Sequence, residues 1–166
     1  DPELTRYYYA ANLTHTMIDI DLDLVNLENR VNNDLVSNLA NFFYRVLSFL
    51  NKYYDSRTST VLDRGLLDEV VAKCGSVGSL YDSYDFRDVV REVLEISSMG
   101  NKYFQDNAPW ELVKSDKDRG QRVLTDCVNI VKNLTILVKP IMPLFAETME
   151  GQLGLPSLDW SRIEDV

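Results

Sequence analysis

Three side chains at two places in the sequence have the chemistry to bind a flat ligand with a hydrogen-bonding edge. The stretch Asn101–Trp110 ends in Ala-Pro-Trp, so a rigid proline directly precedes an indole. An indole held by a rigid backbone is a platform on which a nucleobase can stack. Asn41 and Arg45 lie four residues apart. Asn offers a donor beside an acceptor and Arg a planar fork of donors, so this pair suits the edge of an unpaired base.

Helical periodicity predicts the element that carries Asn41 and Arg45. We expect Asn26 to cap a long helix that runs to about Tyr53, because its apolar residues recur at spacings of three and four. A polar stripe runs along the same helix and comprises Asp34, Asn38, Asn41, Arg45, Ser48 and Lys52. At this spacing the stripe lies on one face, with Asn41 and Arg45 one turn, about 6 Å, apart. Such a stripe is most often solvated surface, so spacing alone leaves both interpretations open.

Two further helices are predicted to meet beside Trp110. Asp85 is expected to cap a helix whose apolar face reaches Phe104. Pro109 suits the first turn of a short following helix, for which Asn107 is the expected cap. An indole next to a proline is more often packed at a helix end than exposed to a ligand. The sequence therefore leaves open whether the Trp110 ring is exposed.

The remaining pattern predicts an all-α fold, a helical bundle of about five helices. The other expected elements are a short helix at residues 3–14, an extended connector at Ile18–Leu24, a polar loop at residues 55–60, and helices at residues 61–81, Arg119–Val138 and Pro143 to about Leu153. We accordingly divide the chain into a linker segment at residues 1–24, the bundle at residues 25–155 and a C-terminal tail at residues 156–166.

Charge and motif content argue against several functional classes. The net charge of −9 disfavours non-specific nucleic-acid binding, so most phosphate contacts of an RNA ligand are expected to come from elsewhere. No apolar run approaches the roughly 20 residues that span a bilayer, and no membrane partner is predicted. His15 has no nucleophile or paired carboxylate motif around it, and Cys74 and Cys127 match no metal-ligand spacing. No catalytic or metal-binding residues are predicted, and the expected location is the cytoplasm.

Several segments together carry a resemblance that covers nearly the whole chain. They are Leu4–Leu13 (LTRYYYAANL), Arg30–Leu35 (RVNNDL), Asn41–Arg45 (NFFYR), Asn101–Trp110 (NKYFQDNAPW) and Pro140–Pro143 (PIMP). The chain resembles the C-terminal, anticodon-binding part of the methionyl-tRNA synthetases, which are class I aminoacyl-tRNA synthetases. The Ala-Pro-Trp segment favours this family over the related synthetases for Val, Ile, Leu and Cys.

The resemblance implies a function and a set of site residues. Asn41, Arg45, Pro109 and Trp110 match the family positions that bind the CAU anticodon, with Trp110 stacked on its first base and Pro109 setting the ring's position. The implied partners are the anticodon loop of tRNA(Met) and the catalytic domain of the same polypeptide, and the full enzyme attaches methionine to the tRNA in an ATP-dependent reaction.

The family's catalytic signatures, of the His-Ile-Gly-His and Lys-Met-Ser-Lys-Ser types, are absent from these 166 residues. We therefore expect no catalysis by this fragment on its own and no cofactor in it. ATP, methionine and possibly zinc would belong to the missing catalytic part. The alternative hypothesis is a helical protein-docking module without RNA-binding activity.

Overall fold

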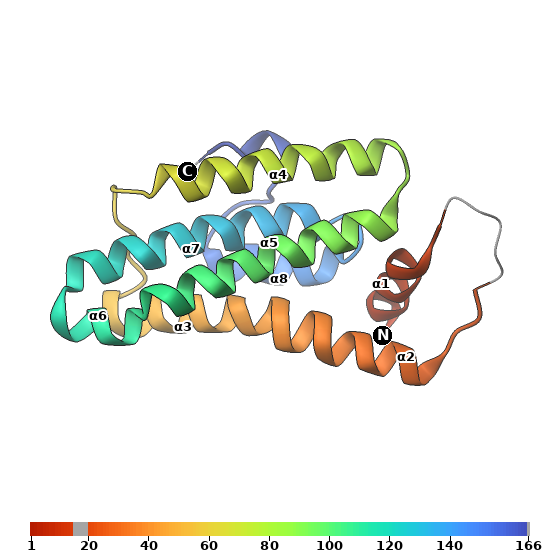
Figure 1. Ribbon diagram of the computed structural model, residues 1–166, viewed down its shortest axis with the longest axis horizontal. Coiled ribbons are helices and arrows are strands. Elements are labelled where there is room, and N and C mark those ends of the chain that lie inside the picture. The colour runs from red at the N-terminus through yellow and green to blue at the C-terminus, as the bar shows by residue number, and fades with distance from the viewer. Residues whose placement is uncertain (15–19, 166) are drawn as a thin grey trace.

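The computed structural model describes residues 1–14 and 20–165, and every regular element in these ranges is a helix (Figure 1). The predicted all-α bundle is confirmed. The elements are α1 (Pro2–Asn12), α2 (Leu24–Arg30), the π-helix η1 (Val31–Ala40), α3 (Asn41–Tyr54), α4 (Arg64–Asp82), α5 (Phe86–Asn107), α6 (Pro109–Ser115), α7 (Lys117–Val138), α8 (Pro143–Leu153) and the 3₁₀-helix η2 (Trp160–Arg162). His15 and the first residues of the alternating connector lie outside the described ranges.

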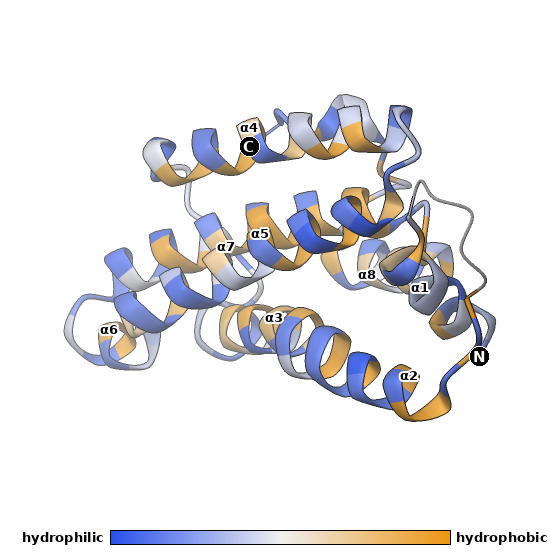
Figure 2. Cartoon of the chain, turned by 45° about the vertical axis from the view of Figure 1, so that its right-hand side comes forward, coloured by the Kyte–Doolittle hydropathy of each residue, from blue (hydrophilic) through white to orange (hydrophobic). Residues whose placement is uncertain are grey.

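Helix α7 lies at the centre of the bundle. It contacts α3, α4, α5, α6 and α8, and most of its side chains are buried, including Leu124, Ile130 and Leu134. Figure 2 shows the apolar side of α4 turned toward the other helices and its polar side turned outward. Each fully buried aliphatic side chain contributes about 1.5–3 kcal/mol, so the packing around α7 dominates the stability of the fold.

Helices α2, η1 and α3 form one uninterrupted helix from Leu24 to Tyr54. The predicted cap, Asn26, is wrong by one turn, because Asp23 holds that position and its carboxylate accepts from the N–H groups of Val25 and Asn26. The middle ten residues are π-helical, with i→i+5 hydrogen bonds that place more residues in each turn. As a result, side chains of α3 point in directions rotated from those that an unbroken α-helix continuing from α2 would give them.

Both ends of the chain pack onto the bundle. In α1, Tyr7, Ala10 and Ala11 belong to the core, and the Glu3 carboxylate accepts from the N–H groups of Leu144 and Phe145 at the start of α8. Beyond α8, Leu158 and Ile163 are buried. The segments expected as linker and tail thus contribute side chains to the same core. No helix in the described part of the chain is both long and apolar enough to cross a bilayer.

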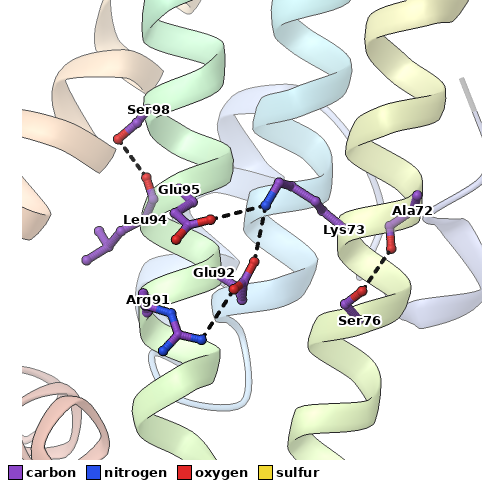
Figure 3. Close-up of polar contacts among 8 residues, drawn as sticks. All are labelled: Ala72, Lys73, Ser76, Arg91, Glu92, Leu94, Glu95 and Ser98. Atoms are coloured by element: carbon purple, nitrogen blue, oxygen red, sulfur yellow. Dashed lines mark hydrogen bonds and ion pairs between the residues drawn. The ribbon is translucent and has the colours of Figure 1, made fainter.

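Helices α4 and α5 are joined on their outer side by ion pairs. Lys73 Nζ lies 3.3 Å from Glu92 Oε2 and 3.1 Å from Glu95 Oε2, and Arg91 also reaches Glu92 (Figure 3). Partly exposed pairs of this kind contribute at most about 1 kcal/mol each. They align α4 with α5, whereas burial of Val70, Cys74 and Val77 supplies the main attraction.

Close helix packing predicts opposite effects of alanine at two glycines. A Cβ at Gly100 of α5 would lie 2.5 Å from Cζ of Phe42, whose ring is fully buried in α3. Gly100→Ala should lower the free energy of unfolding by about 1–3 kcal/mol, because the ring has no space to move into. Gly75 lies exposed in α4 with nothing near its Cβ position, so Gly75→Ala should raise stability by about 0.5–1 kcal/mol.

Urea denaturation of the two variants measures both effects. Equal stability of the Gly100→Ala variant and the unmodified chain would show that α3 and α5 do not approach as closely as described.

Candidate functional site

The four predicted site residues lie where α3 meets α5 and α6. Asn41 and Arg45 are the first and fifth residues of α3, and Pro109 and Trp110 are the first two residues of α6. In Figure 1, α6 forms the left-hand end of the molecule, with α3 running toward it. Residues separated by more than sixty positions in the sequence are thereby brought to the same region.

A buried phenylalanine joins Arg45 to Trp110. The Arg45 guanidinium carbon lies 4.4 Å from the centroid of the Phe104 ring, within cation–π distance. The Trp110 ring lies 6.1 Å from the same ring at an interplanar angle of 43°. Arg45 Nη2 also donates to Gln105 Oε1 at 3.1 Å. The guanidinium is thus held in a defined orientation by two successive residues of α5.

The backbone reverses sharply just before Trp110. Ala108 adopts a left-handed conformation with φ of 42°, which costs a non-glycine residue about 1–2 kcal/mol. This residue, not the predicted Asn107, is the N-cap of α6. Asn107 instead donates its side-chain amide to the Tyr103 carbonyl at 3.0 Å and so belongs to the last turn of α5. The reversal, followed by the fixed φ of Pro109, determines where the indole lies.

The structure gives Trp110 both of the roles that the sequence left open. Pro109 is buried, whereas Trp110 is half-buried and packs against the hydrophobic core. Part of the indole therefore anchors α6, and the rest faces solvent. Packing on Phe104 restricts the ring's orientation, which reduces the entropy lost when a second ring stacks on its free part.

The predicted polar stripe does not form a single solvated face. Asn41 is exposed, and its side chain makes no hydrogen bond within the described residues. Asn38, three positions earlier, accepts from Ser97 Oγ at 2.9 Å and donates to the Leu94 carbonyl at 3.3 Å. Asp34 accepts from the Tyr7 hydroxyl and from Arg30. The π-helical turns direct these two residues toward α5 and α1, so only the α3 part of the stripe is available to a ligand.

A second hydrogen-bonded cluster fixes the end of α5. The Tyr103 hydroxyl donates to Asp126 Oδ2 at 2.8 Å, and the Asp63 N–H donates to Oδ1 at 3.0 Å. Burial raises the pKa of Asp126 above its ordinary value, and these two donors partly offset that effect. The cluster ties α5 to α7 and to the start of α4, one turn before the Ala108 reversal.

Sequence patterns did not identify three residues that support the site. Phe104 was assigned only to an apolar helix face, although its spacing of six from Trp110 is compatible with contact across a helix reversal. Gln105 and Asp126 carry no local signal, because the role of Gln105 depends on Arg45 of α3 and that of Asp126 on Tyr103 of α5 and the N–H of Asp63. Only the packing of those helices brings the partners together.

Solved structures share this fold over almost its full extent. Methionyl-tRNA synthetase from Mycobacterium tuberculosis in complex with methionyl-adenylate matches with a TM-score of 0.89 and 22% sequence identity, covering 98% of this chain and 34% of that one. The apo form of the same synthetase matches equally well and is covered over 35% of its length. The fold is that of a helical part of an aminoacyl-tRNA synthetase.

Sequence comparison narrows the class to one family. Residues 55–166 match the model of the anticodon binding domain of methionyl tRNA ligase, and residues 1–47 match that of tRNA synthetases class I (M). The chain belongs to the methionyl-tRNA ligase family and contains its anticodon-binding domain. A methionine–tRNA ligase from Thiobacillus denitrificans is 36% identical over 163 residues, which cover 96% of this chain. The chain spans 24% of the length of that relative.

The Tyr103–Asp126 hydrogen bond predicts a pH-dependent loss of stability. In Tyr103→Phe, Asp126 loses a donor to its charged form, so its pKa rises further above the unfolded value of about 3.9. A carboxyl with a raised folded pKa binds its proton more tightly when folded, and its contribution to stability falls as the pH rises through that pKa. The variant should lose about 1–2 kcal/mol at pH 7 and less at pH 4.

Chemical denaturation at both pH values measures this difference. The matched control is Tyr84→Phe, because the Tyr84 ring is exposed and its hydroxyl has no hydrogen-bond partner within the described residues. A loss in Tyr103→Phe that is the same at both pH values would contradict the assigned role of the Asp126 charge.

Proposed function

We propose that the surface formed by Asn41, Arg45, Pro109 and Trp110 binds the CAU anticodon of tRNA(Met). The observation that carries the proposal is the shared contact of Arg45 and Trp110 with Phe104. Through this contact, the buried Phe104 ring holds both the half-exposed Trp110 indole, which can stack, and the N–H donors of the Arg45 guanidinium in fixed positions. A single-stranded RNA loop is recognised by such a combination, since its bases splay out, stack on aromatic rings and offer their edges to hydrogen bonds.

Each residue has a distinct role in this proposal. Trp110 stacks on the first anticodon base, the cytosine, and Pro109 fixes the indole. Arg45 and Asn41 hydrogen-bond to base edges from one side of α3. The free amide of Asn41 supports this assignment, because no contact within the described residues competes for it. The Arg45 guanidinium uses Nη2 on Gln105 and retains further N–H donors for a base.

In the complete ligase, this chain would supply recognition and the remainder would supply chemistry. We propose that ATP, methionine and any zinc bind the catalytic part, which attaches methionine to the tRNA. Exposed apolar side chains lie at the start of α2 and just before it, at Leu22, Leu24 and Val25, within the stretch that matches the class I synthetase family. We propose that the catalytic domain of the same polypeptide covers them. A cytoplasmic location remains part of the proposal, consistent with two buried free thiols, Cys74 and Cys127.

The alternative, a protein-docking module without RNA-binding activity, is less well supported. In this alternative, the polar residues of α3 contact only solvent. It does not explain why the Arg45 guanidinium is held in a fixed orientation next to the half-exposed Trp110 indole. Titration with a CAU anticodon stem-loop separates the two hypotheses, since a docking module has no preference for one anticodon over another.

Replacing the indole should weaken RNA binding, because the stacking surface is removed. Trp110→Leu keeps an apolar side chain against Phe104 but has no flat ring. Stacking contributes about 1–3 kcal/mol per base, so affinity for the CAU stem-loop should fall roughly 10- to 100-fold. Fluorescence anisotropy measures the dissociation constant, and Trp160→Ala is the control, because the Trp160 ring packs against Tyr81 of α4.

A stem-loop that lacks the first anticodon base identifies the partner of the indole. The unmodified protein should lose the same 10- to 100-fold on this abasic RNA, whereas Trp110→Leu should lose little more. If the loss of affinity caused by removing the base is the same in Trp110→Leu as in the unmodified protein, Trp110 does not stack on that base.

Two asparagines three residues apart should separate recognition from packing. Asn41→Ala should leave the free energy of unfolding within about 0.5 kcal/mol of the original, since the side chain is exposed. It should lower discrimination against stem-loops with altered anticodons about threefold to tenfold, as expected when one hydrogen bond is removed. Asn38→Ala should instead lose about 1–3 kcal/mol of stability with unchanged discrimination, because its partners lie on α5. Unchanged discrimination in Asn41→Ala would remove this residue from the proposed site.

A further inference from the structure

Arginines and lysines without an ion-pair partner gather where α6 meets the start of α7. Six other cations of the described residues lie within 4 Å of a carboxylate; they are Arg30, Lys73, Arg91, Lys102, Lys139 and Arg162. Arg57, Lys114, Arg119 and Arg122 have no such partner among the described residues. In a chain with net charge −9, guanidinium groups without an internal ion pair are the groups best able to bind an external anion.

Two of these arginines line a cleft. Arg119 and Arg122 lie about one turn apart on α7, and together with Asn107 and Tyr103 they surround a space of about 280 Å³. Arg119 is exposed and Arg122 half-buried. Both side chains are therefore accessible from solvent, and neither is occupied by an internal ion pair.

The two carboxylates of the cleft are already engaged by other donors. Asp126 accepts from the Tyr103 hydroxyl and the Asp63 N–H. The Asp63 side chain caps α4 by accepting from the N–H groups of Gly65 and Leu66. The charge of Arg122 lowers the pKa of Asp126 somewhat, but neither carboxylate lies within 4 Å of a guanidinium nitrogen in the described residues. The guanidinium groups therefore keep their N–H donors for an external anion.

The cleft adjoins the turn that presents Trp110. Asn107 is the last residue of α5 and belongs to the lining, and the Ala108 reversal and Pro109 follow it directly. Helix α6 packs closely on α7, because a Cβ at Gly120 would lie 3.2 Å from Leu112 Cβ. The indole and the arginine pair are thus held in fixed relation by short, rigid connections.

We propose that Arg119 and Arg122 bind backbone phosphates of the RNA loop whose first anticodon base stacks on Trp110. This inference rests on the proposed anticodon-binding function and adds a phosphate site to it. A guanidinium presents paired N–H donors that match two phosphate oxygens and keeps its charge at any physiological pH. The net charge led us to expect most phosphate contacts to come from outside this chain. In this proposal, the chain itself binds some phosphates of the anticodon loop.

The salt dependence of binding tests the proposal. In the Arg119→Gln/Arg122→Gln double variant, affinity for the CAU stem-loop should fall roughly fivefold to tenfold per arginine at low salt. The slope of log affinity against log salt concentration should decrease by about 0.7 for each phosphate of the single-stranded loop that the protein no longer neutralises. Arg87→Gln is the matched control, since Arg87 is exposed at the opposite end of α5, about 30 Å away. Circular dichroism establishes that each variant is folded.

Neutral methylphosphonate linkages placed singly along the loop identify the phosphates. One or two of them should weaken binding by the unmodified protein and have no further effect on the double variant. Equal slopes for the double variant and Arg87→Gln, with Trp110-dependent binding retained, would overturn the phosphate site and leave the anticodon proposal intact. Absence of any CAU preference in the unmodified protein would overturn both.

Discussion

The contacts of one buried ring, Phe104, connect the stability of this protein to its proposed binding surface. The ring is fully buried and packs edge-on against Phe49 of α3, so it belongs to the core. Its other contacts are the Arg45 guanidinium and the Trp110 indole, so it also supports the site. A side chain that is packed on all sides has little freedom to move. Arg45 and Trp110, which contact this ring, are therefore held in defined orientations. Base stacking and hydrogen bonding to a base edge both require such fixed orientations.

Polar contacts fix the helix that carries this ring. Near the middle of α5, Asn101 and Ser97 form a cluster with Asn38 of η1, in which the Asn38 side-chain carbonyl oxygen accepts from Ser97 and the Asn101 amide donates to Asn38 and to the Ser97 carbonyl. Near its end, the Tyr103–Asp126 bond ties α5 to α7. Buried polar groups are costly unless paired, so these clusters specify one axial position of α5 against its neighbours. Hydrophobic packing alone tolerates sliding along the helix axis.

Sequence periodicity was sufficient for the bundle but not for its polar contacts. Apolar spacing and proline positions located α5, α6, α7 and α8 closely, because each helix must bury one face and a proline cannot continue a helix. The ten π-helical residues in the first long helix follow no local rule, and they moved Asn38 from the expected solvent face into a contact with α5. Trp110 and Arg45 were predicted as site residues from their chemistry and the family resemblance, and the structure places both against Phe104. Phe104 and Gln105 were missed, because only tertiary packing brings them to the site.

The hydrogen bonds from the first residues of α8 to Glu3 give the start of the chain a mechanical role. A force applied at Asp1 passes through the carboxylate of Glu3 to Leu144 and Phe145, and then through the packing of α8 on α7 to the centre of the bundle. The chain start is therefore connected through α8 to α7, the helix that carries Arg119.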